Sequence, residues 1–318
     1  MFCMVGGGVT YIYYLRGKAF ETPDHPFDII AEFSSPIISG SRQRATTFAS
    51  DICILETNVD LDGALLENTQ KGLLFDMGNK EVLYAHGGFE KVYPASITKI
   101  MTGMLALKYG NLSDTIVITE EHLRLEEASQ VCGFRPGDVV TLEQLLNALL
   151  VYSGNDAAAA IAEHVGGTTE NFVKMMNQYA AELGCTGTHF MNPHGLHDEN
   201  HYTTCYDIYL MLKEALNYPQ FIAISKQPYY TMYFTRGDGS EKSIYLEATD
   251  HYLTGAANTP KGVSVLGGKT GTTSLAGNCL ALLCQDAYGK PYCSIVMGAK
   301  TKDVLYEQMN SLLIAIRQ

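Results

Sequence analysis

The sequence of 318 residues has no tryptophan, no Cys-x-x-Cys pair, no internal repeat and no excess of basic residues. Lys and Arg number 22 against 34 Asp and Glu, which gives a formal net charge of −12. Nucleic acid requires a basic face, so this balance excludes a nucleic-acid-binding protein. An anionic substrate would instead need one locally placed Lys or Arg. The 46% of apolar residues and 18% of charged residues are typical of a globular chain and exclude a disordered one.

The eight cysteines are dispersed through apolar stretches, and no pair has the spacing of a zinc finger. They are Cys3, Cys53, Cys132, Cys185, Cys205, Cys279, Cys284 and Cys293. A free cysteine packs as a small hydrophobic residue, so the dispersal predicts buried free thiols rather than disulfides. Cysteine usage therefore does not indicate the compartment.

The first fifteen residues carry no charge and are followed by Arg16 and Lys18. As a helix they would reach ~22 Å, short of the ~30 Å hydrocarbon core of a membrane. The basic region that begins a signal peptide is missing. We predict that residues 1–50 hold the tail of an export or anchor segment and a spacer, which attaches the protein to a membrane through its N-terminus. The alternative is a plain apolar N-terminus.

Regular patterning begins near residue 51 and predicts one α+β domain over 51–318. Residues 72–84 predict a β-hairpin, residues 263–300 predict strands, and residues 301–316 predict a closing helix. Helical spacing of apolar residues lies between them, over 93–110, 141–152, 156–165, 168–184 and 203–216. Thr141 and Gln144 form a capping-box pattern, and Asp156 is a second candidate cap. The economical arrangement is a sheet built from both ends of the domain, with an all-helical subdomain inserted at roughly 110–225.

The first candidate cluster is Ser96-Ile97-Thr98-Lys99, at the start of the predicted helix over 93–110. Residues three apart on a helix share a face, so the Ser96 hydroxyl and the Lys99 amine are expected to be neighbours. A lysine can remove the serine proton only where burial or another cation lowers its pKa, and Lys269 is the candidate cation. Alone, Ser-x-x-Lys is more typical of a solvated helix face.

The second candidate cluster, Ser153-Gly154-Asn155, interrupts a strongly apolar helical pattern. Gly154 breaks the helix and lets two polar side chains face one point. Ser153 is then placed to relay a proton, and Asn155 to hold a substrate amide. Alone, such a tripeptide is usually a turn.

The third candidate cluster, Lys269-Thr270-Gly271-Thr272, predicts an edge strand. An edge strand has unpaired N–H and C=O groups, so an extended peptide can lie beside it as an added strand. Lys269 would supply the local positive charge that a C-terminal carboxylate requires. Alone, the stretch is typical of an ordinary strand that ends in a turn.

Taken in order, PASITK, SGN and KTGTT resemble the motif trio of the serine penicillin-recognising enzymes. Longer stretches, among them GLLFDMGNKEVLYAHGGFEKVYPASITKIMT, RPGDVVTLEQLLNALLVYSGNDAAAAIAEHV and SIVMGAKTKD, resemble the D-alanyl-D-alanine carboxypeptidases, the low-molecular-weight penicillin-binding proteins. The resemblance covers about residues 70 to 316. It implies the β-lactamase/transpeptidase-like fold, an antiparallel sheet flanked by helices. Several relatives carry a further C-terminal β-rich domain, which we do not expect in the 318 residues of this sequence.

The resemblance also implies an activity and its partners. The chain would remove the terminal D-Ala from peptidoglycan stem pentapeptides, with β-lactams as inhibitors and without a cofactor. It would act outside the cytoplasm, secreted or anchored on the outer face of the cytoplasmic membrane. Ser96 would be the acylated nucleophile, Lys99 its general base, and Ser153 part of the proton relay.

The substrate-binding roles follow from the same resemblance. Asn155 would clamp the substrate, and Lys269 and Thr270 would bind its terminal carboxylate. The backbone N–H groups of the nucleophile and of Thr272 would form the oxyanion hole, and Gly271 lies just before Thr272 on the same strand.

Three alternatives share part of this pattern. Endopeptidase action on cross-links would use the same residues. A class A β-lactamase has Ser-Asp-Asn where this chain has Ser153-Gly154-Asn155, and residues 191–200 offer no equivalent of its deacylating glutamate. A non-catalytic sensor of muropeptides or β-lactams would need no activated nucleophile.

The sequence HGLHDENH has the spacing of a zinc site. It contains His194, His197, Asp198 and His201, all in a predicted polar loop. No second ligand cluster accompanies it, so we predict no metal and expect His194 to support the active-site fold.

Overall fold

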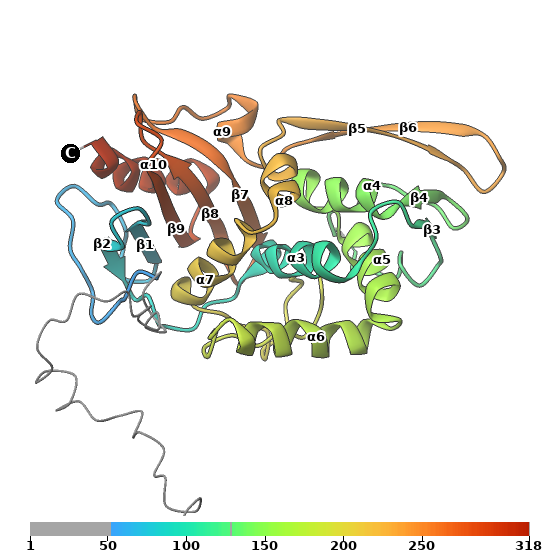
Figure 1. Cartoon of the computed structure of the whole chain (residues 1–318), viewed down its shortest axis with the longest axis horizontal. Coiled ribbons are helices and arrows are strands. Elements are labelled where there is room, and N and C mark those ends of the chain that lie inside the picture. Colours follow the sequence, from blue (N-terminus) through green and yellow to red (C-terminus); the bar gives the residue numbers. More distant parts are fainter. Residues whose placement is uncertain (1–51, 128, 318) are drawn as a thin grey trace, which may run out of the picture. The chain divides into compact units, whose positions relative to one another are not determined.

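A computed structural model describes residues 52–127 and 129–317, and the statements below concern these residues. Five strands form an antiparallel sheet in the order β2-β1-β9-β8-β7. They are β1 (Lys71–Asp76), β2 (Glu81–His86), β7 (Ser264–Thr273), β8 (Gly277–Gln285) and β9 (Pro291–Ala299). Strands from both ends of the described chain therefore share one sheet, as predicted (Figure 1).

The five-stranded sheet is buried on both faces. Alternate residues of β8 enter two different hydrophobic clusters, with Ala281 on the side of the helices and Leu282 on the side of α10 (Lys302–Leu313). A strand covered on both faces reads as a continuous apolar run, which explains the sequence NCLALLC. The short 3-10 turn η3 (Ile314–Arg317) follows α10.

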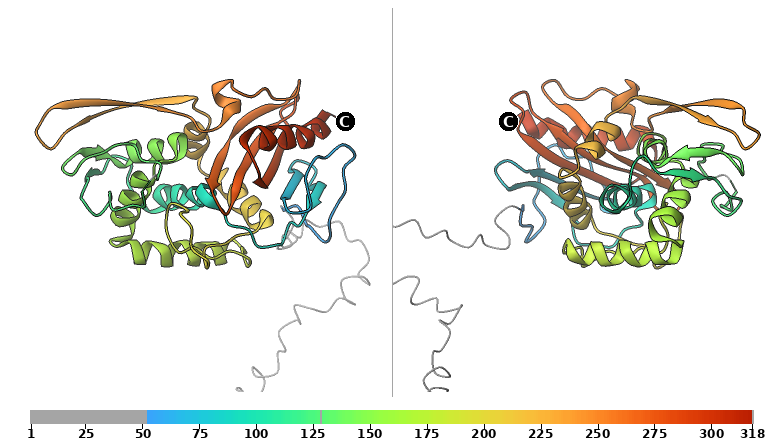
Figure 2. Two further views of the ribbon diagram at one scale, coloured as in Figure 1. Left: turned by 180° about the vertical axis from the view of Figure 1, so that it is seen from behind. Right: turned by 45° about the vertical axis from the view of Figure 1, so that its right-hand side comes forward.

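Most other helices lie on the opposite face of the sheet from α10 (Figure 2). They are η1 (Ala95–Thr98), α3 (Lys99–Tyr109), α4 (Leu142–Asn147), η2 (Ala148–Tyr152), α5 (Asn155–Gly166), α6 (Thr169–Glu182), α7 (Cys205–Ala215) and α8 (Pro219–Ser225). The short α9 (His251–Thr254), before β7, instead contacts α10 through the rings of His251, Tyr252 and Tyr306. Helix α3 contacts α5, α6, α7 and α8, and its residues 99–106 are all buried. A helix buried on every side fixes its first residue, Lys99, inside the protein.

Local signals at the helix ends are partly confirmed. The capping box is present: Gln144 donates its backbone N–H to the Thr141 hydroxyl, and the side chain of Gln144 accepts from the N–H of Thr141. The cap at Asp156 is wrong, because α5 begins one residue earlier with Gly154 at its N-cap. The predicted helix over 141–152 is also not uniform, since η2 at its end is a π-helical turn. π-Helical turns are frequent at functional sites.

A second, four-stranded sheet was not predicted. Its order is β3-β4-β5-β6, and its strands are β3 (Thr115–Val117), β4 (Val139–Thr141), β5 (Tyr229–Thr235) and β6 (Glu241–Glu247). The missed signal is the alternation of buried and exposed residues in β5, followed by a turn that contains Gly237 and Gly239. The region over 110–225 thus holds β3 and β4 besides its helices. Its boundaries stay predictions, and residues 1–50 lie outside the described residues.

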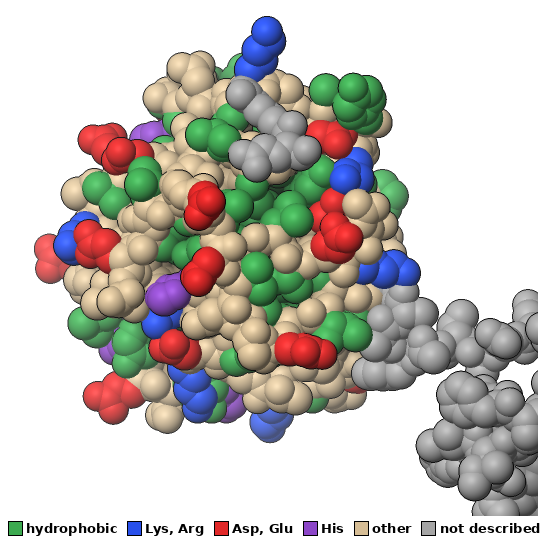
Figure 3. Space-filling view, turned by 90° about the vertical axis from the view of Figure 1, so that its left-hand side faces the viewer, with side chains coloured by type: hydrophobic (Ala, Val, Ile, Leu, Met, Phe, Trp, Pro, Cys, Tyr) green, Lys and Arg blue, Asp and Glu red, His purple; other side chains and the backbone are tan. Residues whose placement is uncertain are grey.

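The seven cysteines within the described ranges are all buried and free, as predicted. The face drawn in Figure 3 mixes acidic, basic, polar and hydrophobic side chains, and basic side chains do not gather there in one patch. Between residues 52 and 317, apart from 128, no helix combines the length and apolar character needed to cross a membrane.

Candidate active site

Ser96 lies in the 3-10 turn η1, which runs directly into the N-terminus of the buried helix α3. The residue before it, Ala95, has a φ of 48°, a conformation that an alanine rarely adopts. A loop presses against this turn: a Cβ on Gly195 would lie only 1.8 Å from the carbonyl oxygen of Ala95. Glycine at 195 therefore lets two backbones meet directly beneath the serine. Backbone strain of this kind is found where a side chain must be held in one place.

The amine of Lys99 is 0% exposed and makes three contacts. Its Nζ lies 2.8 Å from the Ser96 Oγ, 2.6 Å from the Asn155 Oδ1 and 2.8 Å from the backbone oxygen of His194. The predicted pairing of Ser96 with Lys99 is present, and Asn155 belongs to the same cluster. Burial, and then the charge of Lys269, hold the pKa of Lys99 well below its usual value.

Ser153 and Lys269 form the second half of the site. Ser153 ends η2 with a φ of 71°, and its Oγ accepts a hydrogen bond of 3.0 Å from the Lys269 Nζ. Lys269 is 1% exposed and also donates to the backbone oxygen of Thr270 at 2.9 Å. Burial lowers the pKa of Lys269 to about 7, against a smaller raising effect of Asp250. This lysine can therefore change its charge near neutral pH.

Strand β7 is the edge of the five-stranded sheet, as predicted, and it lies against η1. A Cβ on Gly271 would stand 3.0 Å from the backbone nitrogen of Ser96. The absence of a side chain at 271 thus allows the strand to approach the serine closely. Thr272 follows with its side chain exposed, and its hydroxyl is 3.1 Å from the Asn278 Oδ1. Thr270, on the inner side, is hydrogen-bonded through its hydroxyl to Thr249.

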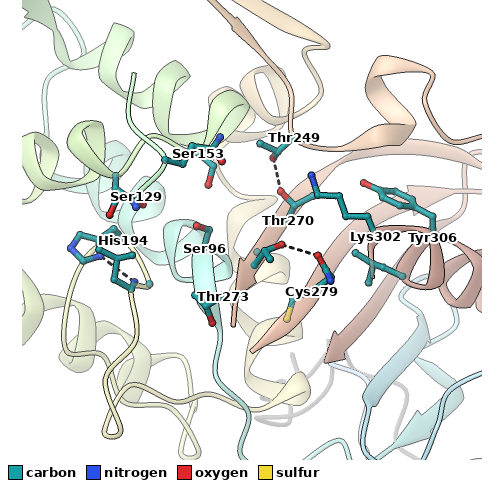
Figure 4. A pocket seen from close by; sticks show the side chains of 18 residues that line it. Ser96, Ser129, Ser153, His194, Thr249, Thr270, Thr273, Cys279, Lys302 and Tyr306 are labelled. Atoms are coloured by element: carbon teal, nitrogen blue, oxygen red, sulfur yellow. Dashed lines mark hydrogen bonds between the residues drawn. The ribbon is translucent and has the colours of Figure 1, made fainter. Parts of the chain in front are cut away.

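The three predicted clusters border one cavity of about 300 Å³ (Figure 4). Ser96, Ser153 and Thr270 come from three different elements and lie around its centre in Figure 4. Among the predicted residues, those that line the cavity are Ser96, Ser153, Asn155, Thr270, Gly271 and Thr272. Lys99 and Lys269 are buried behind this lining, each bonded to one of the two serines. The structure thus brings all eight predicted residues together.

Several cavity residues were not predicted. They are Ser129, Gln130, Thr249, Lys302, Tyr306 and others from loops and from α10. Lys302 is the cation on the cavity lining, and its side chain is exposed, in contrast to the buried Lys269. No local motif marks these positions, because they reach the cavity only through the packing of distant segments.

Asp156 holds one wall of this cavity in place. Its carboxylate accepts hydrogen bonds of 2.8 and 3.0 Å from the backbone N–H of Cys132, while the backbone N–H of Asn155 donates to Gln130 at 2.8 Å. The Gln130 amide in turn donates to the backbone oxygen of Tyr152. Burial raises the pKa of Asp156. The residue predicted as a helix cap therefore ties the loop before Phe134 to the Ser153 turn.

The histidine-rich loop builds structure around the nucleophile. His201 is within 2.9 Å of the Thr98 hydroxyl, and His194 lines the cavity with its backbone oxygen on Lys99. Burial, and then the charge of Lys99, lower the pKa of His194 to about 3, so its imidazole is neutral. Within the described ranges, no group of three His, Cys, Asp or Glu residues could hold a metal ion.

Residues 66–301 match the family model described as D-alanyl-D-alanine carboxypeptidase. The chain is similar to the D-alanyl-D-alanine carboxypeptidases DacF of Bacillus subtilis and DacC of Escherichia coli. It is 34% identical to DacF over 254 residues, which is 78% of this chain and 62% of DacF. It is 30% identical to DacC over 282 residues, which is 84% of this chain and 64% of DacC. The chain therefore spans less than two thirds of either relative.

Solved structures give the same likeness. A variant of a Streptomyces DD-transpeptidase superposes with a TM-score of 0.71 at 25% identity, over 77% of this chain and 95% of the other. A D-alanyl-D-alanine carboxypeptidase from Mycobacterium tuberculosis superposes with a TM-score of 0.67 at 27% identity, over 81% of this chain and 91% of the other. The antiparallel sheet with flanking helices that was predicted from the motif trio is thereby confirmed.

Proposed function

Because this chain belongs to the D-alanyl-D-alanine carboxypeptidase family, we propose that it is a serine D,D-carboxypeptidase that removes the terminal D-Ala from peptidoglycan stem pentapeptides. One observation carries the proposal: the Ser96 hydroxyl, beside a cavity that borders an edge strand, lies 2.8 Å from the buried amine of Lys99. The other residues are proposed to act around this pair.

Lys99 is proposed as the general base. A neutral amine has two N–H groups and one lone pair. The Asn155 Oδ1 and the backbone oxygen of His194 can only accept, so they take both N–H groups. The lone pair is then left for the third neighbour, the O–H of Ser96. The depressed pKa of Lys99 supports this role, because burial and Lys269 favour the neutral amine.

Acylation then follows from the position of the edge strand. The substrate peptide lies beside β7, and the Ser96 Oγ attacks the carbonyl carbon of the penultimate D-Ala. The oxygen of the tetrahedral intermediate is proposed to accept hydrogen bonds from the backbone N–H groups of Ser96 and Thr272. The close approach of Gly271 to the Ser96 nitrogen supports this assignment. Such donors are worth roughly 3–4 kcal/mol each in hydrolases.

Ser153 and Lys269 are proposed to deliver the proton that the leaving D-Ala requires. The Ser153 hydroxyl lines the cavity and accepts from Lys269. It is proposed to give its own proton to the departing amine and to take in return the proton that Lys99 removed from Ser96, so that Lys99 is neutral again. Water then attacks the acyl-enzyme, again with Lys99 as base, and restores the free Ser96 hydroxyl. No cofactor is needed for either half-reaction.

The terminal carboxylate of the substrate is proposed to bind at Thr270. Lys269 was predicted for this role, but it is buried and donates two hydrogen bonds, to the Ser153 hydroxyl and to the backbone oxygen of Thr270. It therefore contributes positive charge from behind the strand and does not contact the carboxylate itself. Lys302 has an exposed amine on the same cavity, and we add it as the cation that meets the carboxylate directly. A cation at this place favours substrates with a free C-terminus.

Peptidoglycan as substrate implies a protein that acts outside the cytoplasm and is acylated by β-lactams. Endopeptidase action remains the alternative that uses the same residues. A β-lactamase and a non-catalytic sensor are less well supported: residues 191–200 offer no deacylating glutamate, and a sensor needs no buried base beside its serine.

The test is acylation by fluorescent penicillin, mapping of the modified residue, and measurement of D-Ala released from a stem pentapeptide. We expect a stable adduct on Ser96 and D-Ala release that Ser96→Ala abolishes. Ser113→Ala, on an exposed loop, is the matched control and should keep both. Fast penicillin turnover would support the β-lactamase instead, and labelling without D-Ala release would support the sensor.

A further inference from the structure

Asp250 is a buried carboxylate that the proposed reaction does not use. It is 5% exposed and stands directly before α9. Its Oδ1 accepts hydrogen bonds from the N–H of Tyr252 at 3.0 Å and from the hydroxyl of Tyr306 at 3.2 Å. Its Oδ2 is buried without a hydrogen-bond partner in the described part of the chain. A buried carboxylate oxygen left alone is costly, so this one requires a partner.

A small cavity of about 10 Å³ connects Asp250 with Lys269, because both residues line it. This is about the smallest space that holds one water, and a buried water needs two to four polar partners. Lys269 offers one: its ammonium group has three N–H donors, of which Ser153 and Thr270 take two. Ser225 lines the same cavity; its hydroxyl donates to the backbone oxygen of Ile222 at 3.5 Å, and its oxygen can still accept from a water.

Titratable groups face this pair from α3, α9 and α10. Lys269 is faced by Lys99 from α3 and by Asp250 from the segment before α9. Asp250 is faced by Tyr252 from α9, by Tyr306 from α10 and by Lys269. Burial raises the pKa of Asp250 to about 6, and the charge of Lys269 acts against this rise. Asp250 is thus the acidic group that opposes the loss of the Lys269 proton.

We propose that Asp250 is the buried counter-ion of Lys269 and acts on it through one bridging water in the small cavity. Asp250 is a positioning residue, since it does not line the large cavity where substrate binds. It keeps the ammonium group on Lys269, and that charge in turn keeps the Lys99 amine neutral beside Ser96. The catalytic meaning of the pair rests on the proposed function, whereas the pair itself does not.

The direct test is a titration of Lys269 by NMR in the intact chain labelled with carbon-13 at the lysine ε-carbon. The signal is assigned by its absence in Lys269→Arg. We expect a midpoint near 7 in the unmodified chain and a midpoint about one unit lower or more in Asp250→Asn, because an opposite charge has been removed. Asparagine keeps the oxygen that caps α9. An unchanged midpoint in this variant overturns the proposal.

Two further variants serve as a control and as a substitute for Asp250→Asn in this titration. Asp303→Asn removes an exposed carboxylate from α10 and should leave the Lys269 midpoint where it was. Asp250→Ser keeps a capping oxygen without the charge, and it replaces Asp250→Asn if that variant does not fold. A crystal structure should show one water bonded to both Asp250 and Lys269, and a dry cavity overturns the bridge.

The kinetic test uses the pH dependence of D-Ala release. Asp250→Asn should move the loss of kcat/KM at high pH to a lower pH, with the rate at lower pH retained. An unchanged profile in a chain that releases D-Ala overturns the catalytic role of the pair. If the unmodified chain releases no D-Ala, the proposed function fails, and the NMR titration still decides whether the pair exists.

Discussion

The Lys269 amine lies 3.0 Å from the Ser153 hydroxyl, although 116 positions separate the two residues in the sequence. This contact joins the edge strand to the break between η2 and α5. With the 2.8 Å contact between Ser96 and Lys99, it divides the site into two serine–lysine pairs. Each pair has one lysine out of solvent and one serine on the cavity.

Removal of the proposed base should greatly slow acylation without unfolding the protein. In Lys99→Met the side chain keeps its length but loses the amine, so the Ser96 proton has no acceptor. We expect the rate of acylation by penicillin to fall by about 10²–10⁴-fold, the usual contribution of a general base. Lys108→Met, near the end of the same helix, is the control and should acylate normally. Normal acylation by Lys99→Met would contradict the assigned base.

The activity should depend on pH through the two lysines. Burial, and then the charge of Lys269, hold the pKa of Lys99 well below its usual value, which favours the neutral base. The pKa of Lys269 is about 7, so its positive charge is present below that pH and lost above it. We expect kcat/KM to fall as the pH rises through about 7. Lys269→Arg should move this fall to higher pH, because arginine stays charged. A value of kcat/KM that does not change across neutral pH would contradict a role for the charge of Lys269.

The exposed amine of Lys302 should affect substrate binding more than chemistry. In Lys302→Gln we expect KM for a stem pentapeptide to rise about tenfold, as for the loss of roughly 1.4 kcal/mol from a charged contact, with little change in kcat. A peptide amidated at its C-terminus should be insensitive to the change. Lys300→Gln, which removes a cation paired with Glu67 outside the cavity, is the matched control. Equal effects of the two variants would exclude a specific carboxylate contact.

The close approach at Gly195 should make this position intolerant of a side chain. Gly195→Ala adds a Cβ 1.8 Å from a backbone oxygen in a conformation with a φ of 89°. We expect a loss of about 3 kcal/mol or more in the free energy of unfolding by urea. Gly184→Ala is the control, because its φ is 81° but nothing lies within 4 Å of the added atom. It should cost only the strain of the left-handed conformation, about 1–2 kcal/mol. Similar losses of unfolding free energy in the two variants would show that the loop around Gly195 moves to make room for the added Cβ.

His201 should make the fold sensitive to acid. Burial lowers its pKa from 6.5 to about 4, and its neutral ring contacts Thr98. Its stabilising contribution is complete above the unfolded value of 6.5 and is lost as the pH falls through about 4. We expect this loss to reach about 3 kcal/mol and to be missing in His201→Gln. Urea unfolding at neutral and acidic pH measures this loss in the unmodified chain and in His201→Gln. An equal loss in both proteins would show that His201 is accessible to protons in the folded state.

The pairing of Ser96 with Lys99 was predictable because the η1 turn that holds Ser96 runs directly into α3, so a spacing of three residues still places both side chains on one face. The convergence of the three clusters was predictable only through their order and resemblance. The edge strand at β7 was predictable from its glycines and its apolar run. These predictions depend on local pattern, which the sequence carries directly.

Other parts of the site depend on packing between distant segments. Asn155 was predicted to hold substrate, yet its Oδ1 also accepts from Lys99 because α5 begins beside α3. Asp250 lies in a segment with no motif, and Lys302 received no role from the sequence although it lies in the stretch SIVMGAKTKD. The neighbours of both residues are set by how α10 and α9 pack against the sheet. The β5–β6 hairpin carried a readable alternation, but its pairing with β4 joins Val139 to Thr235, which are 96 positions apart.

The buried thiols have a practical consequence. The seven cysteines between residues 52 and 317 are shielded in the native state, so an alkylating reagent can reach them only when the chain opens. The rate at which these thiols are modified therefore measures the rate at which the folded chain opens. Because Cys279 lines the cavity beside Ser96 and Cys284 packs on the other face of the same strand, their rates of modification would report the opening of separate parts of the molecule.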